Sequence, residues 1–150
     1  MLRRLVGSGD KIAFMVLPFL AGGVLLNLAF PTTFGVGGPP ALLRAVSILV
    51  LVPGVAIWAW SVLLILRFVP RGELITGGPY AFVKHPLYAS VALLVLPWLG
   101  FLLNTWLGAA LGAVLYVADR IFAPEEEATL SERFGPRWDA YRRAVKFPWA

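Results

Sequence analysis

The stretch "LPWLGFLLNTWLGAALG", residues 96–112, places only Asn104 and Thr105 as a polar break between two apolar segments. A bilayer core is roughly 30 Å thick and an α-helix rises about 1.5 Å per residue, so a span needs about 20 mostly apolar residues. The flanking segments, 87–103 and 106–122, fall within the usual range around that length. Because two residues allow only a tight turn, we expect a hairpin of two membrane-spanning helices.

The composition of the whole chain is that of a membrane protein. Its 150 residues are 59% hydrophobic and 14% charged, with a mean hydropathy of +0.81, well outside the balance of a soluble domain. Two further apolar stretches, 12–30 and 41–69, are long enough to span, with a Pro/Gly-rich break between them. We therefore expect an all-α, polytopic integral membrane protein with about four transmembrane helices in one domain, 1–150. Alternatively, residues 1–30 form a signal peptide, although no small-x-small cleavage pattern precedes Pro31.

Two classes of site are disfavoured by composition. The chain has no cysteine, which excludes a disulfide framework, a thiolate nucleophile and Cys-based metal centres, and we expect no metal. The formal charge of +5 would suit nucleic acid in a soluble protein. Here the basic residues flank apolar segments, where they set topology and meet anionic lipid, so we expect membrane lipids rather than nucleic acid as partners.

The basic residues also predict an orientation, because lysine and arginine accumulate in cytoplasmic loops. With four spans, all but Arg44 fall on one side: Arg3, Arg4, Lys11, Arg67, Arg71, Lys84, Arg120, Arg133, Arg137, Arg142, Arg143 and Lys146. Trp98 and Trp106 fit the aromatic belt of the opposite interface. We expect both termini and any active site in the cytoplasm, with the protein in the inner or plasma membrane of a prokaryote.

The polar loop "GGPYAFVKHPLY", residues 77–88, holds the only histidine of the chain, His85. Pro86 suits the first turn of the following helix, so His85 should lie at its N-terminus, where unpaired N–H groups favour an anion. Tyr80 and Tyr88 add aromatic faces and hydroxyls. The alternative is that both tyrosines are interfacial anchors and that His85 is a helix cap.

The polar tail "APEEEATLSERFGPRWDAYRRAVKFP", residues 123–148, combines an acidic cluster with an amphipathic segment. We expect Pro124 to begin a new helix with Glu125–Glu127 in its first turn, and Gly135 to end it. Trp138 and Tyr141 alternate with basic residues, a pattern typical of a cytoplasmic helix lying on an anionic surface. Lipid contact explains the basic residues, whereas three adjacent carboxylates call for a cationic partner.

Loop and tail together resemble the isoprenylcysteine carboxyl methyltransferase and phospholipid methyltransferase family, from about Arg71 onward. The family's first motif runs T-x-G-P-Y-x-x-x-R-H-P-x-Y, and the matching residues are Thr76, Gly78, Pro79, Tyr80, His85, Pro86 and Tyr88. The second runs E-E-x-x-L-x-x-x-F-G-x-x-Y-x-x-Y before a proline, and the matching residues are Glu126, Glu127, Leu130, Phe134, Gly135, Tyr141 and Pro148. Lys84 replaces an arginine and Trp138 a tyrosine.

The resemblance implies an integral-membrane methyltransferase that holds S-adenosylmethionine between segments 76–88 and 123–148. Carried over by position, the cofactor-binding residues are Tyr80, His85, Pro86, Tyr88, Glu126 and Glu127. We expect catalytic roles for Glu127, Arg133 and Arg143, the arginines as groups that position an anionic acceptor. The acceptor would be lipophilic, through carboxyl methylation of an isoprenylcysteine-like substrate or N-methylation of a lipid amine.

Two other functions stay open at this stage. An NADPH-dependent, sterol-reductase-like enzyme would share the histidine and tyrosine pattern, but a dinucleotide phosphate suits arginines better than three glutamates. A non-catalytic membrane protein of the same fold is the second alternative, because Lys84 loses the bidentate geometry of arginine and Trp138 loses a hydroxyl. The sequence does not indicate an oligomeric state.

Overall fold

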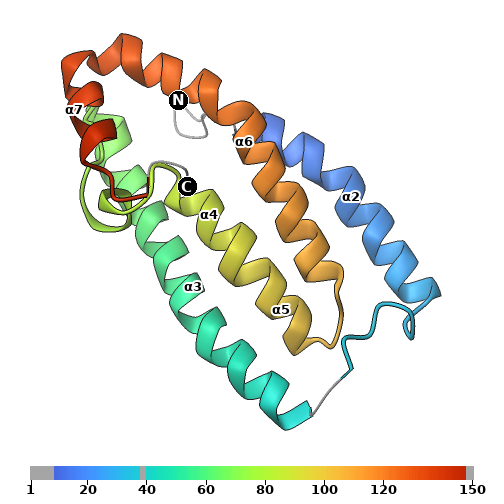
Figure 1. The fold of residues 1–150 in the computed structure, drawn as a ribbon. Coiled ribbons are helices and arrows are strands. Elements are labelled where there is room, and N and C mark those ends of the chain that lie inside the picture. Colours follow the sequence, from blue (N-terminus) through green and yellow to red (C-terminus); the bar gives the residue numbers. More distant parts are fainter. Residues whose placement is uncertain (1–8, 38–39, 148–150) are drawn as a thin grey trace.

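The structure, a computed structural model, describes residues 9–37 and 40–147, which form helices and one isolated bridge. The predictions for Arg3, Arg4 and Pro148 lie outside these residues. Figure 1 shows the long helical segments side by side and the short helix near the C-terminus packed against one end. In chain order the helices are α2 (Gly9–Ala29), α3 (Pro40–Phe68), α4 (Pro86–Ser90), the π-helical segment η3 (Val91–Val95), α5 (Leu96–Leu102), α6 (Leu107–Phe134) and α7 (Pro136–Ala144).

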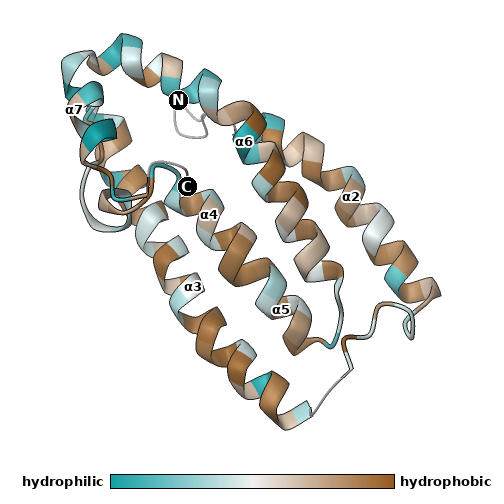
Figure 2. Cartoon of the chain, in the orientation of Figure 1, coloured by the Kyte–Doolittle hydropathy of each residue, from teal (hydrophilic) through white to brown (hydrophobic). Residues whose placement is uncertain are grey.

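The expectation of an all-α, polytopic membrane protein is confirmed. Helices α2, α3 and α6 are long and apolar enough to cross a membrane, and the continuous segment Pro86–Leu102 is apolar but shorter. The expected spans at 12–30, 41–69, 87–103 and 106–122 all fall on these helices. Figure 2 shows apolar residues along the four segments and hydrophilic residues gathered where α6 meets α7.

The helices pack in the order α3, α4–α5, α6 and α2. A small core of Ile12, Ala92, Leu115 and Ala118 joins three of them. Outward-facing apolar side chains remain largely exposed, for example Phe14 at 81% and Leu49 at 74%. Such surfaces are stable only against lipid, so the burial pattern agrees with a membrane location.

The expected hairpin between the third and fourth segments is also confirmed. Asn104 adopts a left-handed conformation with φ of 57°, and the Thr105 N–H donates to the Gly100 carbonyl at 2.9 Å. The Thr105 hydroxyl donates to Asn27 Oδ1 at 2.7 Å, and the Trp106 N–H donates to the Phe34 carbonyl at 2.9 Å. The polar break therefore closes the turn and also fastens it to α2 and the segment after it.

Glycines allow the two hairpin helices to approach closely, and this contact gives a stability prediction. A Cβ on Gly112 would collide with the carbonyl oxygen of Ala92, a backbone atom that cannot move aside alone. We expect Gly112→Ala to destabilise the protein by about 1–3 kcal/mol, the usual cost of overpacking, seen as a lower melting temperature in detergent. Gly22→Ala is the matched control, because a Cβ there meets nothing within 4 Å. A control as unstable as Gly112→Ala would contradict this account.

One expectation about the tail is wrong. Pro124 does not begin a new helix, because α6 continues through it to Phe134, so Glu125–Glu127 lie inside a helix and not in a first turn. An interior proline removes one helical hydrogen bond and crowds the preceding turn. Both halves of α6 are nevertheless packed, since Ala118 and Ala123 are buried before Pro124 and Leu130 and Phe134 pack against α7 after it. Figure 1 shows α6 changing direction in its C-terminal part and reaching over the end of α3. Gly135 does end α6, as expected.

Candidate functional site

Gly78 allows the loop between α3 and α4 to approach α3 closely. The loop contains two short 3₁₀ turns, η1 (Val69–Arg71) and η2 (Gly78–Ala81). Gly78 has a φ of 61°, and a Cβ there would lie 3.1 Å from ring carbons of Trp60 on α3. Only glycine combines this conformation with this close approach. The turn fixes the direction of the chain that follows, up to Lys84 and His85.

Lys84, His85 and Glu127 form a cluster that connects this loop to α6. Lys84 Nζ donates to Glu127 Oε1 at 2.5 Å, and His85 Nε2 lies 3.4 Å from the same oxygen. The side chains of Lys84, His85 and Glu127 are only 10%, 5% and 20% exposed. His85 is the residue before α4, as expected, but its ring makes no capping hydrogen bond to that helix. His85 therefore occupies the N-cap position of α4, but its ring faces Glu127 and does not cap the helix.

The cluster shifts the ionisation of Glu127, which lies beyond the apolar part of α6. Hydrogen bonding from His85, partly opposed by burial and assisted by Lys84, lowers the pKa of Glu127 from 4.5 to about 2. The carboxylate is therefore charged at any physiological pH. It offers a fixed negative charge beside two nitrogen donors.

This shift predicts how stability depends on pH. A carboxyl group whose pKa falls on folding stabilises the protein above its unfolded pKa, and this contribution is lost as pH falls from about 4.5 toward 2. We expect the difference in melting temperature between the wild type and Glu127→Gln to shrink across that range. Glu125→Gln is the control. Glu125 lies on the same helix as Glu127, but it pairs with the exposed Lys11 of α2. A difference that is constant with pH would contradict the assigned pairing.

The aromatic residues of α7 pack inward over the loop. Trp138, Tyr141 and Val145 are buried, at 2%, 7% and 6% exposure, against Leu74, Tyr80, Leu130 and Phe134. The aromatic side of α7 therefore packs on the protein, while its basic residues are exposed; that this amphipathic helix lies on an anionic surface stays a prediction. The loop and α6 bury these rings more completely than a membrane interface would, because an interface leaves part of each ring in contact with water. The Phe147 N–H also donates to the Phe82 carbonyl at 2.8 Å, so the tail closes over the loop.

The remaining predicted cofactor-binding residues lie around this cluster. The Tyr80 carbonyl accepts the Tyr141 hydroxyl at 2.8 Å, and burial, followed by the charge of Glu126, raises the pKa of the Tyr80 phenol well above its usual value. Pro86 is fully buried at the first position of α4. Tyr88 is half-buried and packs toward the α2–α6 core. Tyr80 thus packs with the buried residues of α7, while Tyr88 lies further along α4.

The two arginines predicted to be catalytic are exposed. Arg143 is on α7 and its Nε donates to the Asp139 carbonyl of the same helix at 3.2 Å. Arg133 lies near the end of α6, with its guanidinium 5.3 Å from the Phe134 ring centroid. Among the described residues neither forms an ion pair with Glu127. The structure therefore brings neither arginine into the cluster.

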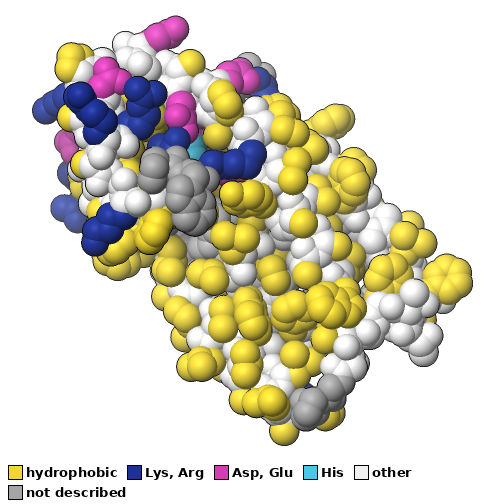
Figure 3. All heavy atoms as spheres, viewed as in Figure 1, with side chains coloured by type: hydrophobic (Ala, Val, Ile, Leu, Met, Phe, Trp, Pro, Cys, Tyr) yellow, Lys and Arg dark blue, Asp and Glu magenta, His cyan; other side chains and the backbone are white. Residues whose placement is uncertain are grey.

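Charge gathers at this end of the molecule. Figure 3 shows lysine, arginine and acidic side chains together at the end that carries α7, and a largely hydrophobic surface over the rest of the visible face. No three metal-ligating side chains come together in the part of the chain that the structure describes. The chemistry available at this end is that of ion pairs, imidazole and aromatic rings.

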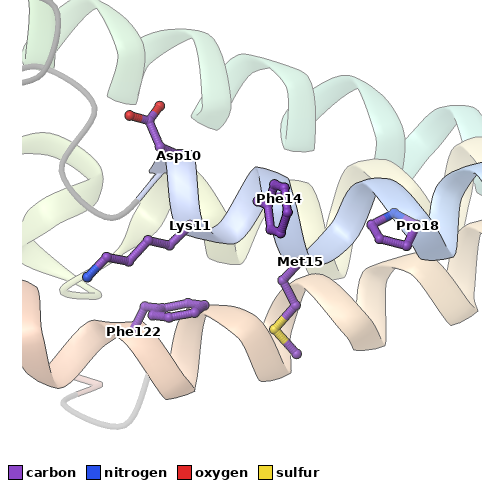
Figure 4. Close-up of a pocket in the computed structure, with 6 residues that line it drawn as sticks. All are labelled: Asp10, Lys11, Phe14, Met15, Pro18 and Phe122. Atoms are coloured by element: carbon purple, nitrogen blue, oxygen red, sulfur yellow. The ribbon is translucent and has the colours of Figure 1, made fainter.

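A separate hollow of about 700 Å³ opens between α2 and α6. Figure 4 shows Met15 directed from α2 toward α6, with Phe122 on the facing helix; Asp10, Lys11, Phe14 and Pro18 complete the lining. Its walls are almost entirely apolar, and Lys11 pairs with Glu125 at 2.6 Å. It shares no lining residue with the Lys84–His85–Glu127 cluster, so we assign it no chemical role.

Sequence reasoning missed the partnership of Lys84 with Glu127. Lys84 stood out only as a replacement for arginine, and nothing in the spacing showed that it would meet an acid 43 residues away. The available signal was its position beside His85, together with an acidic cluster that lacked a cationic partner.

Fold and site together define a class of protein: an integral membrane helical protein with a charged, partly buried cluster where its helices leave the apolar region. A sequence model of the isoprenylcysteine carboxyl methyltransferase (ICMT) family matches residues 41–132, more than half of the chain. The chain therefore belongs to this family, which is one of integral-membrane methyltransferases. Neither the curated proteins nor the solved structures used for comparison gave a significant match.

Proposed function

We propose that this protein is a methyltransferase that uses S-adenosylmethionine to methylate a lipophilic acceptor. The observation that carries the proposal is the Lys84–His85–Glu127 cluster, which joins the two family-like motifs at the end of the membrane helices. The family match supports the reaction class and covers all three residues. We further propose that the whole chain acts as one domain, with both termini and this site in the cytoplasm, as the distribution of basic residues predicts.

The residues present suit this cofactor. S-adenosylmethionine carries a sulfonium, an ammonium, a carboxylate and an adenosine. Glu126 and Glu127 would hold cationic groups, and His85 and Lys84 would supply donors to the carboxylate. Tyr80 and Tyr88 would offer aromatic faces, and Pro86 would fix the direction of α4. A dinucleotide phosphate would instead meet the two glutamates and be repelled.

The bound cofactor would supply an activated methyl group, transferred by in-line displacement at carbon. The chain itself then needs to align donor and acceptor and to exclude water. Alignment lowers the entropic part of the activation barrier for methyl transfer. The buried Trp138–Tyr141 layer covers the loop, so it would shield the site from solvent. Glu127 would fix the cofactor and would not act as a nucleophile.

The burial of His85 and its position beside Glu127 favour a carboxylate as the methyl acceptor. A carboxylate attacks as it stands, whereas an ammonium headgroup must first lose a proton to a base. His85, the only histidine, is 6% exposed and faces Glu127, so it is poorly placed to serve as that base. We therefore propose carboxyl methylation of an isoprenylcysteine-like compound. Exposed Arg133 and Arg143 stay candidates for positioning the anionic acceptor.

Transfer of a labelled methyl group tests this function. Detergent-purified protein would be incubated with methyl-labelled S-adenosylmethionine and either a farnesylated cysteine derivative or phosphatidylethanolamine. We expect label in the prenylcysteine fraction, released by mild alkali as methanol because it is an ester. Alkali-stable label in the phospholipid would contradict the proposed acceptor, and no transfer to either would contradict the acceptor class as a whole.

A further inference from the structure

An arginine of α6 meets the end of α3 at Gly72. This glycine follows η1 with a φ of 70°, and a guanidinium nitrogen of Arg133 lies 3.1 Å from the position that a Cβ on Gly72 would occupy. Arg71 directly precedes the glycine, and Arg67 lies one helical turn earlier in the same continuous helical segment. The fold therefore gathers three arginines from two distant parts of the chain, here called the arginine triad: Arg67, Arg71 and Arg133.

No acidic side chain neutralises the arginine triad within residues 9–37 and 40–147. All three arginines are exposed, and none of them forms an ion pair in these ranges, not even with Glu73 or Glu132, the nearest acidic residues in the chain. The C-terminal ends of α3 and α6 favour a positive charge, which accounts for a basic residue at each end but not for their convergence. Because like charges repel, an anion between the arginines would stabilise this arrangement.

We infer that the arginine triad binds the phosphate headgroup of an anionic membrane lipid. Guanidinium groups match phosphate oxygens in charge and geometry, and they can donate two parallel hydrogen bonds. Leu63, one turn before Arg67 on the same face of α3, is 65% exposed, so the apolar surface that meets acyl chains continues directly to the triad. An acyl chain along Leu63 would bring its headgroup to the level of Arg67. This continuity favours a lipid over a free phosphate ion.

The assignment goes beyond the proposed function, because neither the cofactor nor the methyl acceptor takes part. It is an alternative to a role for Arg133 in positioning the acceptor. The lipid would join the end of α3 to the C-terminal part of α6, which reaches over it in Figure 1. Since one headgroup would contact both helices, it would hold in place the part of α6 that also carries Glu127.

Native mass spectrometry of lipid binding tests the assignment. Detergent-purified protein would be titrated with phosphatidylglycerol, which is anionic, and with phosphatidylcholine, which is zwitterionic. We expect the wild type to bind phosphatidylglycerol more tightly. Arg71→Gln and Arg133→Gln should each weaken phosphatidylglycerol about fivefold, which corresponds to about 1 kcal/mol per arginine, and leave phosphatidylcholine unchanged. Inorganic phosphate at the same concentration should not displace the lipid.

Arg143→Gln is the matched control, because it removes the same charge from an exposed arginine whose Nε donates to the Asp139 carbonyl of its own helix. It should bind both lipids like the wild type. Equal weakening by Arg143→Gln would show a diffuse attraction of the lipid to the basic end of the molecule and overturn the inference. Unchanged binding in Arg71→Gln and Arg133→Gln would also overturn it, as would displacement by inorganic phosphate, which would indicate a site for a free anion.

Discussion

Replacing Glu127 by glutamine is expected to weaken binding of S-adenosylmethionine by at least about 100-fold. The substitution keeps the shape of the side chain but removes the charge that would hold the cationic groups of the cofactor. Hydrogen bonds to charged groups contribute about 1.5–3 kcal/mol each, and the upper part of this range corresponds to about 100-fold. Calorimetric titration of the purified variant measures the effect directly.

The substitution also leaves Lys84 without its partner, so a control for folding is needed. An unpaired charge at 10% exposure destabilises its surroundings. The double variant Lys84→Met with Glu127→Gln removes both charges and should regain stability without regaining affinity. Glu125→Gln, a neighbouring glutamate paired with Lys11, should bind like the wild type. If Glu125→Gln and Glu127→Gln had the same affinity, Glu127 would be a structural residue only.

Replacing Trp138 by alanine is expected to detach α7 from the loop. Trp138 is 2% exposed, its ring centroid is 5.4 Å from that of Tyr141, and it lies at the centre of the contacts between α7, α6 and the loop. Removing a buried tryptophan costs about 3–5 kcal/mol. Because α7 has only nine residues, it should not stay docked after that loss.

Limited proteolysis measures this detachment. Trypsin should cleave the variant rapidly at the exposed Arg142 and Arg143, while the membrane helices stay intact, and cofactor affinity should fall at least tenfold. Trp58→Ala is the matched control, since Trp58 is 41% exposed on α3. It should be cleaved like the wild type. Unchanged cleavage of Trp138→Ala would show that α7 is held by other contacts.

Most of the fold could be predicted from the sequence, because bilayer thickness fixes how long an apolar helix must be. The four apolar segments and the hairpin turn at Asn104 followed from this rule alone. The end of the fourth helix could not be predicted in this way, because Pro124 is a local signal for a helix start, yet α6 continues through it to Phe134. The burial of Trp138 likewise depends on Leu74 and Tyr80, 64 and 58 residues earlier in the chain, which an amphipathic pattern does not reveal.

The candidate site was predictable in outline only. The loop and the tail could be paired by resemblance, and His85 and Glu127 do meet in the structure. The role of Lys84 depends on a long-range ion pair, which sequence spacing does not encode. Arg133 and Arg143 were predicted to be catalytic, but both are exposed and lie outside the cluster. Basic residues near the end of a membrane helix show the same sequence pattern whether they face a binding site or water.

The central claim is that the Lys84–His85–Glu127 cluster belongs to a site for S-adenosylmethionine. Calorimetric titration of the detergent-purified protein with S-adenosylmethionine, S-adenosylhomocysteine and NADPH tests it most directly. We expect micromolar binding of the first two ligands and no binding of NADPH. Binding of NADPH alone would support a reductase, and binding of none of the three would leave the family membership as ancestry without the activity.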